Sequence, residues 1–197
     1  MKHCFACSEI ELAGQLGKGG FFAVHEVKKI SLRHFVEGDD DPAEEESTEN
    51  PCEDEDYIQG VVQNRKFMEG HCLRNGKDPR YAFKTMRKEN LMDPGTFLNS
   101  LVDMTIEFKF LSCVRHPGII KMRAASVGDL LQPDAFIILD KIYDTLTDRI
   151  EKWRKKDQSL FNMFFDFKKK RDKSALAKRL LVAFDIASAL AYLHDMK

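Results

Sequence analysis

The sequence predicts an α+β fold with a five-stranded antiparallel sheet, one helix packed against that sheet, and further helices toward the C-terminal end. Two patterns predict this class. Up to Asp140, runs rich in β-branched and aromatic residues occur in the order strand, strand, strand, helix, strand, strand. From Thr145 onward, apolar residues recur every three or four positions, as they do along one face of a helix. We therefore expect the sheet to precede the helical part of the chain.

The strands are expected where apolar runs lie between turn residues. Their predicted ranges are 10–17, 22–30, 81–86, 119–122 and 135–140. The first two flank a glycine-rich turn, which predicts a hairpin. The fourth can continue toward Ser126.

The helix after the third strand has a clear start signal. Asp93 is expected to cap it, and Pro94 suits its first position. Its apolar residues repeat at helical spacing: Phe97, Leu98, Leu101, Met104, Phe108 and Leu111. The sequence His116-Pro117-Gly118 follows this helix and opens a turn.

Two more helices are expected after Thr145. The first carries Leu146, Ile150 and Trp153 on one face. The second is longer, from about 174 to 194, and its apolar positions are Leu176, Leu180, Phe184, Ala187 and Leu190. This apolar face is broad and nothing else in the sequence is expected to cover it, so we expect the natural polypeptide to continue past Lys197.

Composition excludes several protein classes. The chain has 197 residues, of which 43% are hydrophobic and 32% charged, so it is not disordered as a whole. It has no apolar run near the ~18 residues that a membrane-spanning helix needs, and its N-terminus lacks the apolar stretch of a signal peptide. Five cysteines are an odd, sparse set that argues against a disulfide framework. These features predict an intracellular protein, cytoplasmic or nuclear, without a membrane partner.

The net charge of −1 averages over two unlike parts of the chain. Twelve acidic residues and no Lys or Arg occur between Glu37 and Asp56. Without these twelve, 20 of the 32 acidic residues remain against 31 basic ones, so the rest of the chain is basic. Because this acidic window has almost no apolar residues, we expect 37–79 to be a long, mostly disordered insertion.

Three features before Asp140 could take part in nucleotide chemistry, although each alone favours an ordinary structural role. The sequence Leu-Gly-Lys-Gly-Gly-Phe-Phe-Ala-Val over 16–24 places glycines at a turn, where backbone N–H groups can face phosphate oxygens. Lys84 interrupts an apolar strand, where an unpaired cation is costly to bury. Glu107 lies at the edge of the apolar helix face, where a carboxylate favours a cation, and Lys84 is the simplest candidate.

Together these features resemble the small lobe of the eukaryotic-type protein kinase family. The resemblance covers the chain from about Ile10 to its end and follows a fixed order. It consists of the glycine hairpin, Ala82-x-Lys84 in the third strand, Glu107 ten residues before Pro117, a strand closing on Leu139-Asp140, and Ala-Leu-Ala-Tyr-Leu-His over 189–194. It divides the chain into an N-terminal extension (1–9), a small lobe with the acidic insertion (10–143) and the start of a helical large lobe (144–197).

The resemblance implies a set of site residues. Lys84 would contact the α- and β-phosphates of ATP, held by an ion pair to Glu107, and these are the two candidate catalytic residues. Leu16 and Val24 would cover the adenine, Ala82 would line the same pocket, and Leu139 would form its back wall. Asp140 and Ile142 would offer backbone groups to the adenine edge. The implied nucleotide-binding residues are Leu16, Gly17, Lys18, Gly19, Gly20, Phe21, Val24, Ala82, Lys84, Leu139, Asp140 and Ile142.

The implied function is the ATP-binding part of a protein kinase that phosphorylates Ser or Thr in a protein substrate. Two departures from the family pattern limit this implied function. Phe22 stands where the family loop has its third glycine, so we expect a stiffer turn or the loss of one close backbone approach. No His-Arg-Asp and no Asp-Phe-Gly string occurs, so the Mg²⁺ expected for a complete kinase has no ligands here, and we expect this chain to be inactive alone. Two alternatives stay open: a non-catalytic, pseudokinase-like binding or scaffold module, and a glycine-hairpin domain that binds no nucleotide.

Three weaker signals favour their ordinary interpretations. His3, Cys4 and Cys7 could be half of a zinc site, but no second closely spaced cysteine pair exists, so no metal site is predicted. The basic run 168–171 favours a solvated loop over a nucleic-acid or lipid site. Ser47 and Thr48, among carboxylates, resemble acidophilic phosphorylation sites.

Overall fold

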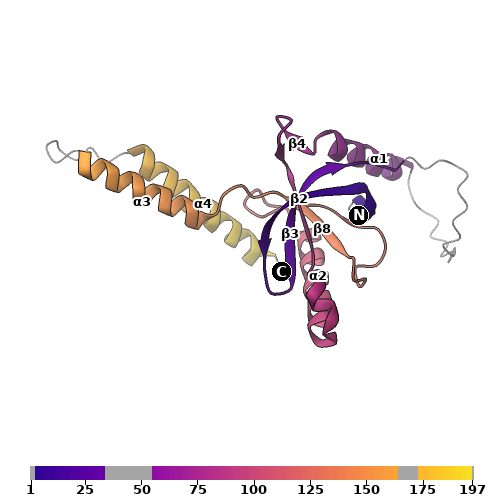
Figure 1. Ribbon diagram of the computed structural model, residues 1–197. Coiled ribbons are helices and arrows are strands. Elements are labelled where there is room, and N and C mark those ends of the chain that lie inside the picture. The colour runs from indigo at the N-terminus through magenta and orange to yellow at the C-terminus, as the bar shows by residue number, and fades with distance from the viewer. Residues whose placement is uncertain (1–2, 34–54, 164–172, 197) are drawn as a thin grey trace, which may run out of the picture. The chain divides into compact units, whose positions relative to one another are not determined.

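A computed structural model describes residues 3–33, 55–163 and 173–196 of the chain (Figure 1). The fold is α+β, with a mixed sheet and four α-helices among the described residues. The chain forms two compact units. The first contains Met1–Cys113 and Lys121–Lys141, and the second contains Val114–Ile120 and Ile142–Lys197. Each unit is described separately below.

The first unit is built on a six-stranded sheet in the order β1-β7-β8-β6-β3-β2. The strands are β1 (His3–Phe5), β2 (Ile10–Lys18), β3 (Phe22–Ile30), β6 (Tyr81–Met86), β7 (Met122–Ser126) and β8 (Phe136–Asp140). The predicted hairpin and the strands at 81–86 and 135–140 are confirmed. The fourth strand begins at Met122 instead of 119, because Ile119 N donates to the His116 carbonyl in a turn.

The prediction of five antiparallel strands is wrong at one edge. β1 adds a sixth strand, parallel to β7, with His3 opposite Ala124 and Phe5 opposite Ser126. Phe5 is fully buried, which explains why these three residues join the sheet. A three-residue strand is too short to show the alternation by which strands are recognised in a sequence.

One face of the sheet packs against a helix that the sequence did not predict. α1 (Glu55–Gly70) contributes Met68 to a core that includes Phe83 and Phe136. Cys72, which follows the helix, belongs to the same core. The rings of those two phenylalanines stack with centroids 4.4 Å apart. A short hairpin, β4 (Leu73–Arg74) and β5 (Asp78–Pro79), then leads into β6. The other members of this core are Phe5, Val27, Ile30, Tyr81, Ala124 and Ile138.

The expectation of disorder over 37–79 is therefore wrong for residues 55–79, which form α1 and the β4–β5 hairpin. The rest of the predicted insertion, including Ser47 and Thr48, lies outside the described residues. So does the basic run 168–171. Among the described side chains of residues 59–79, the buried ones are Met68 and Cys72. Two buried side chains are too few to show up as a pattern in a polar sequence.

A buried carboxylate links α1 to the start of the sheet. Glu9, only 4% exposed, lies in the short 3₁₀ helix Cys7–Glu9. Its Oε1 accepts from the Arg65 guanidinium at 2.6 Å and from Arg33 N at 3.1 Å, and its Oε2 accepts from Ala6 N at 2.9 Å. The Arg65 guanidinium also lies 4.9 Å from the centre of the Phe5 ring. The three hydrogen bonds to Glu9 satisfy a carboxylate that is otherwise costly to bury.

α2 (Pro94–Cys113) begins as predicted. Asp93 Oδ2 accepts from Thr96 N at 2.8 Å and from Thr96 Oγ1 at 2.5 Å, and these bonds lower the pKa of Asp93. Leu101, Met104 and Leu111 are buried, whereas Leu98 is exposed, so the buried face is narrower than predicted. A 3₁₀ helix, Lys88–Met92, connects β6 to α2.

The second unit contains the two predicted C-terminal helices, α3 (Leu146–Met163) and α4 (Lys173–Asp195). Thr145 caps α3, because its Oγ1 accepts from Asp148 N at 3.1 Å and donates to Asp148 Oδ2 at 2.6 Å. Near the end of α4, Tyr192 accepts from Arg115 N at 3.0 Å and stacks on the His116 ring. Among the described residues, every helix is too short or too polar to cross a bilayer.

Candidate functional site

The predicted pairing of Lys84 with Glu107 is present in the first unit. Lys84 Nζ on β6 donates to Glu107 Oε2 on α2. The side chains are 17% and 29% exposed, so water reaches both only partly. A lysine on an apolar strand therefore has a carboxylate from the neighbouring helix as its partner, and that contact fixes its position.

Several other predicted residues share the sheet face of Lys84. In the β3–β6 pair Val24 lies opposite Lys84, and in the β6–β8 pair Ala82 lies opposite Leu139. Residues directly opposite each other, and residues two positions apart on one strand, point to the same face. Ala82 and Leu139 are buried and Val24 is half-buried. Apolar side chains therefore lie on the same side of the sheet as the ammonium group.

The glycine-rich turn closes the β2–β3 hairpin next to this face. Gly17 pairs with Val24 and Lys18 with Ala23, and Gly19 N donates to the Phe22 carbonyl at 2.8 Å. At Gly17 and Gly20, an added Cβ would have no heavy atom within 4 Å. The backbone at these two glycines therefore has open space beside it, as a group that approaches the turn would need. Leu16, near the end of β2, is exposed.

Two side chains that the sequence analysis missed hold the turn from its carbonyl side. Arg87 Nη1 donates to the Gly19 and Gly20 carbonyls, both at 3.1 Å. Asn90 Nδ2 donates to the Phe21 carbonyl at 3.0 Å, and its remaining contacts are Gly20 O at 3.3 Å and Ser100 Oγ on α2 at 3.4 Å. Asn90 is only 7% exposed. The turn is therefore connected to the helix that carries Glu107.

A surface ion pair adds to this connection. Lys18 Nζ donates to Glu89 Oε1 at 2.8 Å. The hydrogen bond from Lys18 is the main reason that the pKa of Glu89 falls to about 2. Lys18 was predicted to bind nucleotide, and here its ammonium group already has an acidic partner.

Phe22 occupies the approach to Lys84. The Lys84 ammonium lies 4.4 Å from the centre of the Phe22 ring, within the range of a cation–π contact. The neighbouring Phe21 was predicted to bind nucleotide. Its ring meets the Phe22 ring edge to face, with the ring centroids 6.3 Å apart. Lys84 therefore has a carboxylate and an aromatic face as its partners.

The two residues expected at the adenine edge behave differently. Asp140 N donates to the Lys121 carbonyl at 2.9 Å, and its carboxylate accepts from Arg123 Nε at 2.6 Å and Nη2 at 2.9 Å. These bonds raise the pKa of Arg123. The Asp140 side chain is thus committed to Arg123, while Ile142 belongs to the second unit, where it is exposed.

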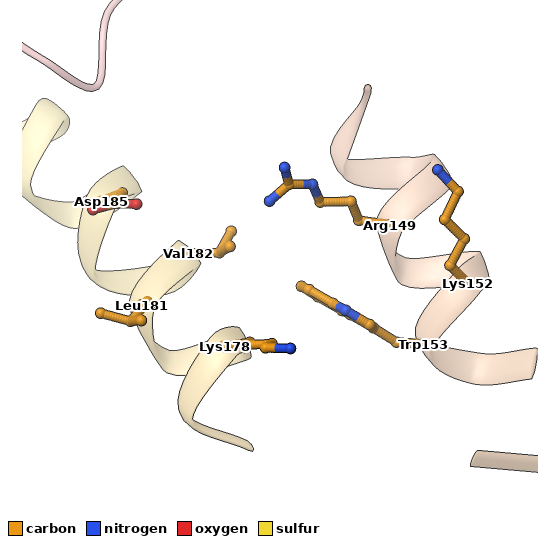
Figure 2. Close-up of a pocket in the computed structure, with 7 residues that line it drawn as sticks. All are labelled: Arg149, Lys152, Trp153, Lys178, Leu181, Val182 and Asp185. Atoms are coloured by element: carbon orange, nitrogen blue, oxygen red, sulfur yellow. The ribbon is translucent and has the colours of Figure 1, made fainter. Parts of the chain in front are cut away.

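The second unit has a cavity of about 320 Å³ between α3 and α4 (Figure 2). Its lining residues are Arg149, Lys152, Trp153, Lys178, Leu181, Val182 and Asp185, none of which was predicted as a site residue. Arg149 and Trp153 point from α3 toward α4, and Val182 points back toward them (Figure 2). Lys152 Nζ lies 3.2 Å from both carboxylate oxygens of Asp144, so part of the positive charge is already paired.

A metal site in the described part of the chain would need several ligating side chains close together. Within these residues, no group of three or more His, Cys, Asp or Glu side chains could hold a metal ion. Cys4 and Cys7, the possible half of a zinc site, belong to no such group.

Comparison with known proteins adds no assignment. No family model matches the chain, and no curated protein matches it either. The resemblance to protein kinases therefore depends on the residues described above.

Proposed function

We propose that the first unit binds ATP, with the nucleotide phosphates beside Lys84, as the ATP-binding part of a Ser/Thr protein kinase. The observation that carries this proposal is the contact between Lys84 and Glu107 on the sheet face next to the glycine turn. This sheet face brings together a held cation, a turn with open backbone and apolar side chains.

Each component suits one part of ATP. The Lys84 ammonium is a point charge for phosphate oxygens, and Glu107 holds it in place before the ligand arrives. The open backbone at Gly17 and Gly20 allows close approach of a phosphate. Val24, Ala82 and Leu139 provide apolar contact for a flat aromatic base. Bound ATP would supply a transferable γ-phosphoryl group, and this chain's residues bind and orient it.

The proposal for this chain is confined to nucleotide binding. The catalytic-base and Mg²⁺-binding residues that the resemblance implies belong to His-Arg-Asp and Asp-Phe-Gly motifs, and neither string occurs in the 197 residues. Protein phosphorylation is therefore proposed for the complete family member.

Thermal unfolding in the presence of Mg-ATP tests the proposal. A ligand at 100 times its dissociation constant stabilises the folded state by about 2.7 kcal/mol, so the wild-type melting temperature should rise with ATP concentration. At the same ATP concentration Lys84→Met should show a much smaller rise, whereas Lys88→Met, which removes an exposed lysine nearby, should keep it. An equal response of wild type and Lys84→Met would remove Lys84 from the nucleotide site and favour the alternative of a domain that binds no nucleotide there.

A further inference from the structure

The ring of Phe22 lies on the same sheet face as the ammonium group of Lys84. Phe22 lies opposite Met86 in the β3–β6 pair, two positions from Val24, which lies opposite Lys84. Because side chains two positions apart share a face, the ring points toward the ammonium group, 4.4 Å from its nitrogen. Phe22 is half-buried, so the ring is partly enclosed at this position.

Lys84 has few directions left for a ligand. Its ammonium group has three N–H donors, and one is directed at Glu107 Oε2. A phosphate oxygen would need to come within about 2.8 Å of the nitrogen. The Phe22 ring occupies one approach to that nitrogen, and Glu107 occupies another.

We propose that Phe22 occupies the phosphate position beside Lys84 in the nucleotide-free chain, and thereby sets the affinity of this site for phosphate-bearing nucleotides. The proposal rests on the proposed function, since it concerns the same site. Phosphates that bind Lys84 must displace the ring. Their binding is then weaker by the free energy of the cation–π contact that is lost. Adenosine, which has no phosphate, does not compete with the ring.

The surrounding contacts favour rotation of the side chain over movement of the turn. The Gly19 and Gly20 carbonyls accept from Arg87, and the Phe21 carbonyl accepts from Asn90 and from Arg87 N. Lifting the turn would break these bonds together, whereas rotation of Phe22 about its own side-chain bonds leaves them intact. The affinity should therefore depend on the side chain at position 22 more than on the flexibility of the turn.

The test compares ATP with adenosine by isothermal titration calorimetry on the full chain and its variants. Phe22→Ala removes both the ring and its bulk, and Phe22→Leu keeps apolar bulk without the π face. Phe67→Leu is the matched control, because Phe67 is an exposed phenylalanine on α1. Unfolding by urea checks that each variant is folded.

We expect Phe22→Ala to lower the dissociation constant for ATP by about twofold to thirtyfold, the range that corresponds to a cation–π contact. Phe22→Leu should give a smaller gain in the same direction. The adenosine constant should stay within about twofold in every variant, and Phe67→Leu should match wild type for both ligands.

The outcomes separate this inference from the proposed function. If ATP binding depends on Lys84 but both Phe22 variants bind ATP as weakly as wild type or more weakly, this inference is overturned and the nucleotide site remains. The same holds if the Phe22 variants gain equally for ATP and adenosine, because phosphate would then not be the competing group. If no protein in the series binds ATP, both proposals fail.

Discussion

Arg65→Met is the sharpest test of how α1 is held on the sheet. In the folded chain the Glu9 carboxylate is 4% exposed and accepts from Arg65 at 2.6 Å. Among the described residues, the donors that remain for this buried carboxylate are Ala6 N and Arg33 N. The substitution also removes the cation from the Phe5 ring.

The expected loss can be worked out from these contacts. Removing one partner of a buried ion pair costs about 3 to 5 kcal/mol. The two remaining backbone hydrogen bonds keep part of the carboxylate's solvation, which favours the lower end of that range, and the loss of the contact with Phe5 adds about 0.5 to 1 kcal/mol. We therefore expect Arg65→Met to lower the free energy of unfolding of the first unit by about 3 to 4 kcal/mol.

Amide hydrogen exchange is the suitable assay. The single tryptophan, Trp153, lies in the second unit, so the assay needs probes within the first unit. Exchange of the β3 and β6 amides measures the opening of the sheet on which α1 packs. Lys66→Met, at an exposed neighbouring position on α1, should change the free energy by less than about 0.5 kcal/mol.

A double substitution isolates the pair. Glu9→Gln with Arg65→Met should cost less than the sum of the two single substitutions, because the second change no longer breaks an ion pair. A loss below about 1 kcal/mol for Arg65→Met, with additive behaviour in the double variant, would refute the reasoning. It would mean that Glu9 is solvated and that α1 is not held through it.

Two further predictions concern the glycine turn. Asn90→Ala should lower the free energy of unfolding by about 1 to 2 kcal/mol and speed exchange of the Gly19 amide, because the carbonyls that Asn90 holds lose a buried donor; an unchanged exchange rate for that amide would contradict the role of Asn90. Lys18→Gln should raise the pKa of Glu89 from about 2 toward its ordinary value near 4.5, as measured by NMR titration of the carboxyl carbon. Since the folded-state pKa is lowered, the Lys18 contact contributes fully above about pH 4.5 and is lost as the pH falls toward 2, so a low pKa retained in Lys18→Gln would exclude Lys18 as its cause.

The sequence predicted those parts of the fold that have strong local patterns. The β2–β3 hairpin, β6 and β8 are apolar runs between turn residues, and α2 has both an Asp93 cap and a regular apolar repeat. The contact between Lys84 and Glu107 was also predictable, because each residue is a charge at an otherwise apolar position and each needs a partner.

Other features depend on contacts between distant parts of the chain and leave no local pattern. β1 is only three residues long and is held by the burial of Phe5. α1 packs through Met68 and the following Cys72, in a segment whose other residues are largely polar. Asn90 looks like an ordinary connecting residue until the fold brings it to the carbonyls of a turn about 70 residues earlier.

At the candidate site, the position of the Phe22 ring also leaves no local pattern in the sequence. The sequence identified it as a departure from the glycine that the family loop has there, and predicted a stiffer turn or a lost backbone approach. The sheet register places its ring beside Lys84 instead, which could not be inferred without the pairing of β3 with β6. The effect of a phenylalanine at position 22, in place of glycine, therefore depends on the pairing of β3 with β6.

The proposed binding of nucleotide phosphates beside Lys84 is tested most directly by the ratio of the adenosine to the ATP dissociation constant. This ratio should be measured by calorimetry in wild type and Lys84→Met. A charge-assisted hydrogen bond is worth about 1.5 to 3 kcal/mol, so Lys84→Met should weaken ATP binding about tenfold or more while adenosine binding stays nearly constant. The same ratio in both proteins would contradict the claim, because the phosphates would then lie away from Lys84.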